Sequence, residues 1–338
     1  MARMRKWKTV GRIFVRYVLP AIVMLFVGMH FYNILRKPEL RQVDYAFHVQ
    51  WLLPAALLYL VTHTIWASFW VMLLRNQGFH ASYPTGWRAY FISQYGKYLP
   101  GKVWVILIRV VMLGASRKDK TIVGLTATYE TLTSMAAGAI VGAVLLPKLR
   151  GDMRQLPFFN ALDYVLLVVA LVPAGLLLLH RLFVHIARYK RGPDGPHLPN
   201  MNPLLSLYGL AQASVGYFLL GISLWMTMQA ILPMPTPLGW DDLLRLTAMS
   251  SIAYIIGFIA FFLPGGVGAR ELVLQVLLAG ELQVLGLDAV AAEGLSVVIT
   301  LVLRLIWTIA EVIVAVLLYR FIPADKRPIL MPAAEVAG

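Results

Sequence analysis

The sequence predicts an all-α polytopic integral membrane protein with about six full spans and two re-entrant hairpins arranged as inverted repeats. Three observations predict this fold class: the scarcity of charge, the length of the apolar runs, and a Pro-Gly break inside two of them. Of 338 residues, 59% are hydrophobic and 14% are charged, and the mean hydropathy is +0.73. Soluble domains carry about 25% charged residues. An ordinary soluble enzyme is therefore excluded.

The apolar residues fall in runs of the length that a bilayer requires, about 20 residues per helix. We expect a single transmembrane domain over residues 1–320 and a cytoplasmic tail over 321–338. Six segments are expected to cross the membrane fully, namely 13–32, 51–73, 121–146, 162–183, 205–231 and 293–319.

Two further apolar stretches, 84–113 and 244–280, are each interrupted at the middle by Leu-Pro-Gly. Proline removes a helix hydrogen bond and clashes with the preceding turn, while glycine tolerates the bend that follows. Each stretch therefore predicts a hairpin of two helices that re-enters the side from which it starts. The residues expected to break the helices are Pro100, Gly101, Pro264, Gly265, Gly266 and Gly268.

The net charge of +14 bears on orientation, because positively charged loops face the cytoplasm. With both hairpins re-entrant, most of the loop Lys and Arg residues fall on the side of the two termini. We therefore expect both termini in the cytoplasm and the chain in the plasma (inner) membrane. The alternative is a full crossing by 244–263, which would place the C-terminus outside.

The two interrupted stretches match each other at a constant offset of 164 positions, and Leu99-Pro100-Gly101 aligns with Leu263-Pro264-Gly265. The repeat units are about 51–146 and about 205–320. Three crossings separate the hairpins, so the units are expected to have opposite orientation. Inverted repeats with broken helices are typical of transporters, whose substrate sites lie where the breaks meet. The alternative is a helix bundle with two unrelated proline kinks.

Ionisable side chains inside apolar segments usually face a cavity or a partner. The densest group lies beside the two breaks, and its cations suit an anionic head group. Snorkelling of the lysines to the interface is one alternative, and a structural Arg270–Glu271 pair that caps the second half-helix is another. The residues expected to bind substrate are Lys97, Lys102, Arg109, Arg270 and Glu271.

Further polar residues inside the spans are expected to line or gate the cavity. Glu130 belongs to a polar stripe at helical spacing, and Arg304 lies at a comparable depth in the last span. We hypothesise that these two side chains pair across the repeat interface. His63 is either a hydrogen-bonded packing residue or a proton carrier. The residues assigned to the cavity or its gate are Gln94, Glu130, Arg304 and Glu311.

Other chemistries find no support in the sequence. There is no cysteine, and no nucleotide-binding, metal-ligand or hydrolase motif is present. We expect no metal, no cofactor and no nucleic-acid partner. Any transport would therefore run downhill or be coupled to an ion or a proton.

The segment Leu263-Pro-Gly-Gly-Val-Gly-Ala-Arg-Glu271 resembles the signature of the lysylphosphatidylglycerol synthase transmembrane-region family, also called the flippase-like domain family. The segment Lys97-Tyr-Leu-Pro-Gly-Lys-Val-Trp104, with Arg109 after it, resembles the partner motif, and Arg304 matches the arginine of the last span. The resemblance covers roughly 50–320. It implies a membrane domain that moves lipids or lipid-linked sugars between leaflets.

Two departures from the family are expected to matter. The third span carries Glu130-Thr131 where the family often has Glu-Arg. No soluble aminoacyl-transferase domain follows residue 320, so the lysyl transfer that names the family is not implied.

The sequence therefore predicts a lipid flippase-like transporter, not an enzyme. Its substrate would be an anionic phospholipid or a lipid-linked glycan or prenyl compound, held at the two Pro-Gly breaks. One alternative is a membrane-embedded lipid-modifying enzyme that uses His63, Glu130 or Glu271. Another is a non-catalytic scaffold for a glycosyltransferase or lipid-synthesis complex.

Overall fold

A computed structural model of the chain describes residues 46–99, 103–114, 116–149, 203–233, 237–260 and 268–322, together with the isolated positions 25, 29, 32 and 169. Every regular element in these ranges is a helix, and the element order falls into two similar groups. We call residues 49–148 the first unit and residues 203–321 the second unit. The predicted spans 13–32 and 162–183 lie outside the described residues.

The first unit consists of two long helices with a broken pair between them. Ser82 caps α4 by accepting the Thr85 N–H at 3.3 Å, and a capping box of Ser116 and Asp119 starts α6. The elements are η3 (Val49–Trp51), α3 (Leu52–Asn76), α4 (Tyr83–Ser93), η4 (Gln94–Tyr98), α5 (Val103–Leu113), α6 (Arg117–Leu145) and η5 (Leu146–Lys148).

The second unit has the same order: a long helix, a broken pair and a long helix. Gly268 precedes α10 with φ +93°, a conformation that side chains other than glycine rarely adopt. Asp288 caps α11 by accepting the N–H groups of Val290 and Ala291. The elements are α8 (Pro203–Ile231), α9 (Trp240–Ile259), α10 (Ala269–Val284) and α11 (Ala289–Phe321).

The predicted spans 51–73, 121–146, 205–231 and 293–319 coincide with long apolar helices, and both remaining stretches are interrupted as predicted. The first interruption begins after η4, where Leu99 is extended (φ −86°, ψ 149°), as the residue before a proline usually is. The second lies between Ile259 and Ala269. The break residues Pro100, Gly101, Pro264, Gly265 and Gly266 lie outside the described residues, while Gly268 lies at the start of α10.

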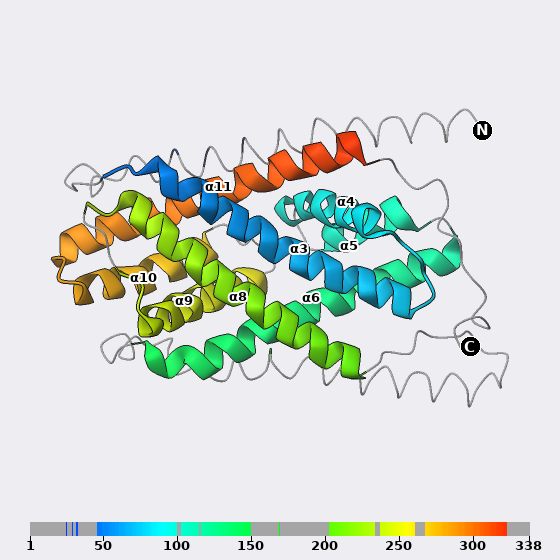
Figure 1. Ribbon diagram of the computed structural model, residues 1–338, viewed down its shortest axis with the longest axis horizontal. Coiled ribbons are helices and arrows are strands. Elements are labelled where there is room, and N and C mark those ends of the chain that lie inside the picture. Colours follow the sequence, from blue (N-terminus) through cyan, green and yellow to red (C-terminus); the bar gives the residue numbers. More distant parts are fainter. Residues whose placement is uncertain are drawn as a thin grey trace.

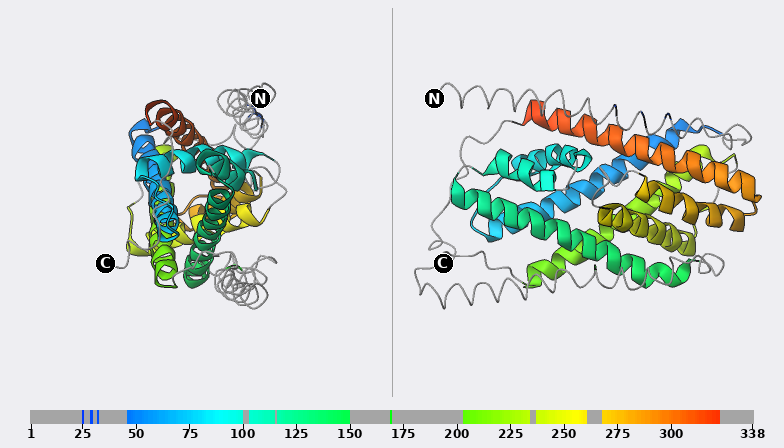
Figure 2. Two further views of the ribbon diagram at one scale, coloured as in Figure 1. Left: turned by 90° about the vertical axis from the view of Figure 1, so that its right-hand side faces the viewer. Right: turned by 180° about the vertical axis from the view of Figure 1, so that it is seen from behind.

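The long helices α3, α6, α8 and α11 run along most of the long axis of the molecule (Figure 1). The pair α4 and α5 lies in one half of this axis, and the pair α9 and α10 lies in the other half. The same separation is visible from behind in Figure 2. The broken ends of the two pairs consequently point toward the middle of the molecule.

Five described helices have the length and composition of membrane spans: the four long helices and α9. The chain is therefore a multi-pass membrane protein. α9 has 20 residues, about 30 Å at 1.5 Å per residue, so its length suits both a full crossing and a re-entrant segment.

The two units are joined most closely by α3 and α8, which pack antiparallel. Ser223 donates to the Ala55 carbonyl at 2.8 Å, and Trp66 donates to the Ala213 carbonyl at 3.4 Å. Gly209 and Gly216 face aromatic rings of α3 where a Cβ atom would come within 2.5 Å. Small residues allow the close approach of membrane helices, because little else drives their association in lipid.

Candidate functional site

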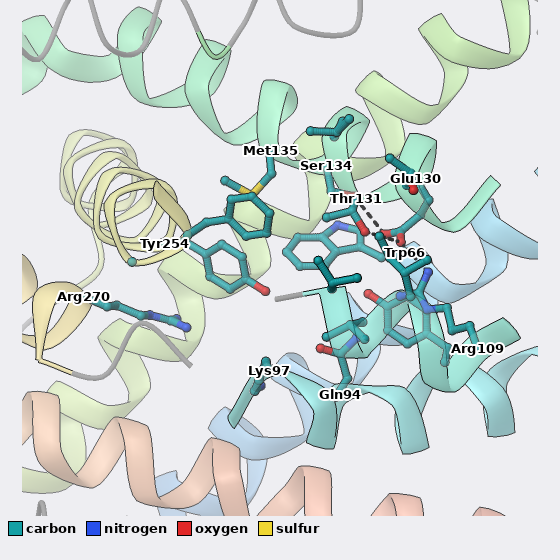
Figure 3. Close-up of a pocket in the computed structure, with 18 of the residues that line it drawn as sticks. Trp66, Gln94, Lys97, Arg109, Glu130, Thr131, Ser134, Met135, Tyr254 and Arg270 are labelled. Atoms are coloured by element: carbon teal, nitrogen blue, oxygen red, sulfur yellow. Dashed lines mark hydrogen bonds and ion pairs between the residues drawn. The ribbon is translucent and has the colours of Figure 1, made fainter. Parts of the chain in front are cut away.

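A cavity of about 230 Å³ lies where the inner ends of the two broken pairs meet (Figure 3). Its wall combines apolar side chains, such as Ile106, Met135 and Phe258, with four basic groups and a row of hydroxyls on α6. Both units contribute to it. The basic groups in the wall are Lys97, Arg109, Arg270 and Arg304, and the other polar ones are Gln94, Thr128, Glu130, Thr131, Ser134 and the two tyrosines Tyr90 and Tyr254.

Arg109 of α5 is fully engaged within the first unit. Its guanidinium donates to Glu130 Oε2 at 2.7 Å and to Ser93 Oγ at 3.1 Å. The same group lies over the rings of Trp70 and Tyr90, at 4.6 Å and 4.3 Å from their centres. Arg109 is only 1% exposed, so this set of contacts replaces its hydration.

Arg304 of α11 pairs within the second unit. Its Nε lies 3.1 Å from Glu271 Oε1 of α10, and Glu271 Oε2 accepts the Gly268 N–H at 2.6 Å. The hypothesis that Glu130 pairs with Arg304 is therefore wrong, since each has a partner in its own unit. The alternative of a structural Arg270–Glu271 pair is not found either, since Glu271 pairs with Arg304, although Glu271 does cap α10.

Arg270 has a different environment from the other arginines of the cavity. It is 8% exposed, and its guanidinium lies over the rings of Tyr254 and Trp307, at 4.5 Å and 4.7 Å. None of the ion pairs found among the described residues includes it. Aromatic faces attract a cation without neutralising it. Arg270 therefore retains its full charge at the cavity wall.

The close approach of α10 to α9 depends on Gly257. A Cβ atom at this position would lie 2.7 Å from Arg270 Cβ, far inside van der Waals contact. Glycine therefore lets the first turn of α10 lie against α9 and places Arg270 at the cavity.

Lys97 of η4 connects the cavity wall to the buried Glu311 of α11. Its ammonium donates to Glu311 Oε1 at 2.5 Å, and Tyr59 donates to the same oxygen. His63 Nε2 lies 3.9 Å from that oxygen. Since the Lys97 ammonium pairs inside the bundle, its interpretation as a snorkelling side chain is wrong. This ion pair joins the broken pair of the first unit to the last helix of the second.

The structure brings together most of the predicted site residues. Gln94, Lys97, Arg109, Glu130, Arg270 and Arg304 all line the cavity. Glu271 and Glu311 lie one contact behind it, as partners of Arg304 and Lys97. Lys102 lies outside the described residues. Within the described part of the chain, no group of three or more His, Asp or Glu side chains is arranged to hold a metal ion.

Sequence reasoning missed the aromatic residues of the site. Tyr254 and Trp307 hold Arg270, Trp66 lines the cavity, and Tyr59 bonds Glu311. Their positions in the sequence could have identified them, because they lie well inside apolar segments, whereas aromatic residues that anchor a helix at the membrane interface lie at its ends. Tyr59 and His63 are also four residues apart, on one face of α3.

Comparison with known proteins identifies the family of the chain. A search of curated proteins finds no match. The family model described as the lysylphosphatidylglycerol synthase TM region matches residues 13–310, which includes the first unit, the second unit up to residue 310 and every residue of the cavity wall. The chain belongs to the lysylphosphatidylglycerol synthase TM region family.

Proposed function

We propose that the chain is a lipid translocator that moves an anionic phospholipid, or a lipid-linked glycan or prenyl substrate, between membrane leaflets. The observation that carries this proposal is the charge of the cavity wall. Four basic side chains face one carboxylate, Glu130, and that carboxylate is already paired with Arg109. Arg270 then supplies the net charge that attracts an anionic head group.

The surroundings of the cavity favour a lipid over a soluble anion. Val103 lines the cavity and is 52% exposed on the outer face of α5. Leu107 and Val111 continue this exposed apolar face along the helix. A head group can occupy the cavity while its acyl or prenyl chains lie along α5 in the bilayer, which avoids moving them through a polar site.

The same proposal includes the architecture. The two units are inverted repeats whose broken pairs re-enter the membrane from opposite sides, with both termini in the cytoplasm and the chain in the inner membrane. Support comes from the shared order of elements and from the placement of the pairs in opposite halves of the long axis. Broken helices that meet near the middle are a common basis of alternating access.

Translocation requires no covalent chemistry, so the proposal assigns the chain no enzymatic activity. Its partners are membrane lipids, and a glycosyltransferase or lipid-synthesis enzyme would supply a lipid-linked substrate.

Reconstitution tests the proposal. Purified protein is placed in liposomes that contain fluorescent phosphatidylglycerol, or a fluorescent polyprenyl phosphate, and leaflet exchange is followed by quenching of the outer label. We expect the wild type to accelerate exchange of at least one of these lipids. Arg270→Gln should slow it about 10- to 100-fold, the effect of losing a hydrogen bond to a charged group. Arg320→Gln, at the exposed end of α11, is the matched control and should leave the rate unchanged.

If the wild type exchanges neither lipid faster than protein-free liposomes do, the proposed function is wrong. Equal rates for Arg270→Gln and the wild type would retain translocation but remove the cavity as its site.

A further inference from the structure

His63 and Glu311 form a second polar cluster, one layer behind the cavity and outside the role proposed for Arg270. Both side chains are buried, with exposures of 0% and 2%. Glu311 Oε1 receives hydrogen bonds from Lys97 and Tyr59, and His63 Nε2 lies 3.9 Å from it. A charged cluster at this depth is unusual in a membrane protein and is most often functional.

The tautomer of His63 follows from its backbone contact. His63 Nδ1 lies 3.1 Å from the Tyr59 carbonyl oxygen, and a carbonyl can only accept, so Nδ1 carries the proton. The neutral imidazole then presents a bare lone pair at Nε2. This atom is buried without a hydrogen-bond partner among the described residues. Two acceptors, Nε2 and the Glu311 carboxylate, therefore face each other with no proton between them.

Lys97 connects this cluster to the cavity. It lines the cavity wall and at the same time supplies the cation that compensates Glu311. An anionic head group in the cavity competes with Glu311 for this ammonium. Once Lys97 turns toward the head group, Glu311 is a buried carboxylate without a cation, which is strongly unfavourable.

We infer that His63 and Glu311 form a proton-binding site that fills when an anion occupies the cavity, so that translocation is coupled to protons. This inference rests on the proposed function. The His63 Nε2 lone pair forms an N–H bond with a proton from hydronium, which becomes water. The imidazolium then carries the positive charge that Lys97 has withdrawn and donates toward Glu311. When the anion leaves, Lys97 returns and the proton is released to water.

Within the cluster, the inference assigns the change of charge to His63, because Lys97 keeps its positive charge on the head group and Glu311 keeps its negative charge beside the imidazolium. Tyrosines and arginines keep their protonation states between about pH 5 and 8, where histidine changes charge. While Lys97 and the arginines are near, they oppose a positive charge on His63, and withdrawal of Lys97 removes part of this opposition. The groups facing the cluster are Tyr59 of α3, Tyr90 of α4, Tyr95, Lys97 and Tyr98 of η4, Tyr254 of α9, Arg270 of α10 and Arg304 of α11.

Proton uptake on anion binding tests the inference directly. Dihexanoyl phosphatidylglycerol, a short-chain lipid whose phosphodiester does not titrate near neutral pH, is added to the full chain in weakly buffered detergent solution containing a pH indicator. We expect the wild type to take up a fraction of a proton, at most one, per lipid bound, as linkage between the two sites requires. The lipid affinity should rise by roughly 5- to 150-fold between pH 8 and pH 5, the usual range of coupling between sites.

The variants assign the proton to this cluster. His63→Gln should bind the lipid without proton uptake and with an affinity that is flat with pH. His48→Gln removes an exposed histidine just before the first unit and should behave like the wild type. Glu311→Gln supplies a second test if His63→Gln does not fold, and it too should abolish uptake. Inorganic sulfate in place of the lipid shows the source of the anion: uptake with sulfate means that a free anion suffices, and uptake with the lipid alone assigns the site to the head group.

The outcomes separate this inference from the function on which it rests. A wild type that exchanges phosphatidylglycerol in liposomes but takes up no proton on binding it overturns the proton site alone. Uptake that persists in both His63→Gln and Glu311→Gln also overturns it. A wild type that neither binds nor exchanges any of the lipids overturns the proposed function itself.

Discussion

Each unit contains one ion pair between its broken pair and a long helix, and the charges of the two ion pairs are reversed. In the first unit, the second helix of the broken pair carries the arginine and the long helix carries the glutamate, Arg109 and Glu130. In the second unit, the broken pair carries the glutamate and the long helix carries the arginine, Glu271 and Arg304. Each ion pair therefore ties a broken helix to the long helix that follows it.

The two units differ in whether an arginine at the cavity remains without a carboxylate partner. Ser93, Glu130 and two rings occupy Arg109 completely, so the arginine of this ion pair is not free to bind an anion. In the second unit the glutamate is preceded by Arg270, which contacts rings and no carboxylate in the described part of the chain. The comparison indicates that Arg109 is a fixed part of the cavity wall and that Arg270 of the second unit is the arginine available to an anion.

The largest loss of stability is expected from Glu130→Gln, which leaves Arg109 buried without a carboxylate partner. Removing one partner of a buried ion pair destabilises a protein by about 3–5 kcal/mol, because the remaining charge has no compensation. The measurement is reversible unfolding in mixed detergent micelles. The double variant Arg109→Met/Glu130→Gln removes both charges and should recover most of the loss.

The recovery distinguishes a charge effect from a loss of packing. If the double variant is less stable than Glu130→Gln alone, the first unit is held by the shape of these side chains and the comparison of the two ion pairs loses its basis.

Glu271→Gln should cost less, near the lower end of that range at about 3 kcal/mol. Its partner Arg304 is 5% exposed where Arg109 is 1% exposed, and the ion-pair distance is 3.1 Å where the first is 2.7 Å. The amide that this substitution introduces also retains an oxygen that can accept the Gly268 N–H. The same unfolding assay measures the loss, and a loss larger than that of Glu130→Gln would reverse the order of the two units.

The sequence predicts much of the arrangement of helices. Length and hydropathy locate the helices α3, α6, α8 and α11, and the Leu-Pro-Gly segments locate both interruptions, because these are local properties of the chain. Of the basic residues expected beside the breaks, Lys97, Arg109 and Arg270 line one cavity, and Lys102 lies outside the described residues.

The sequence does not predict which of these charged residues form ion pairs with each other. Glu130 and Arg304 lie at similar depths in their helices, yet Glu130 pairs with Arg109 and Arg304 pairs with Glu271. Depth gives the position of a residue along the membrane normal, whereas pairing depends on which helices are neighbours and on how each is rotated. Helix packing sets these properties through contacts distant in sequence, such as those between α3 and α8.

Gly257→Val tests whether Arg270 must be held where it is. The new side chain collides with the base of Arg270, since a Cβ atom alone would lie 2.7 Å from Arg270 Cβ. Overpacking of this kind costs about 1–3 kcal/mol. We expect a moderate loss in the unfolding assay together with slower lipid exchange in liposomes. Unchanged exchange would show that Arg270 need not be placed so closely.

The smallest effect is expected from Lys148→Ala, which breaks the ion pair with Asp241. This pair also links the two units, at a distance of 2.8 Å, but its side chains are 49% and 65% exposed. Water solvates both charges whether or not they meet, so an exposed pair adds little to stability. We expect the same unfolding midpoint as the wild type, with a midpoint shift comparable to that of Glu130→Gln as the contrary result. Since the Lys148–Asp241 and Arg109–Glu130 distances are similar, at 2.8 Å and 2.7 Å, unequal effects on stability would show that burial, and not the contact itself, decides what an ion pair contributes.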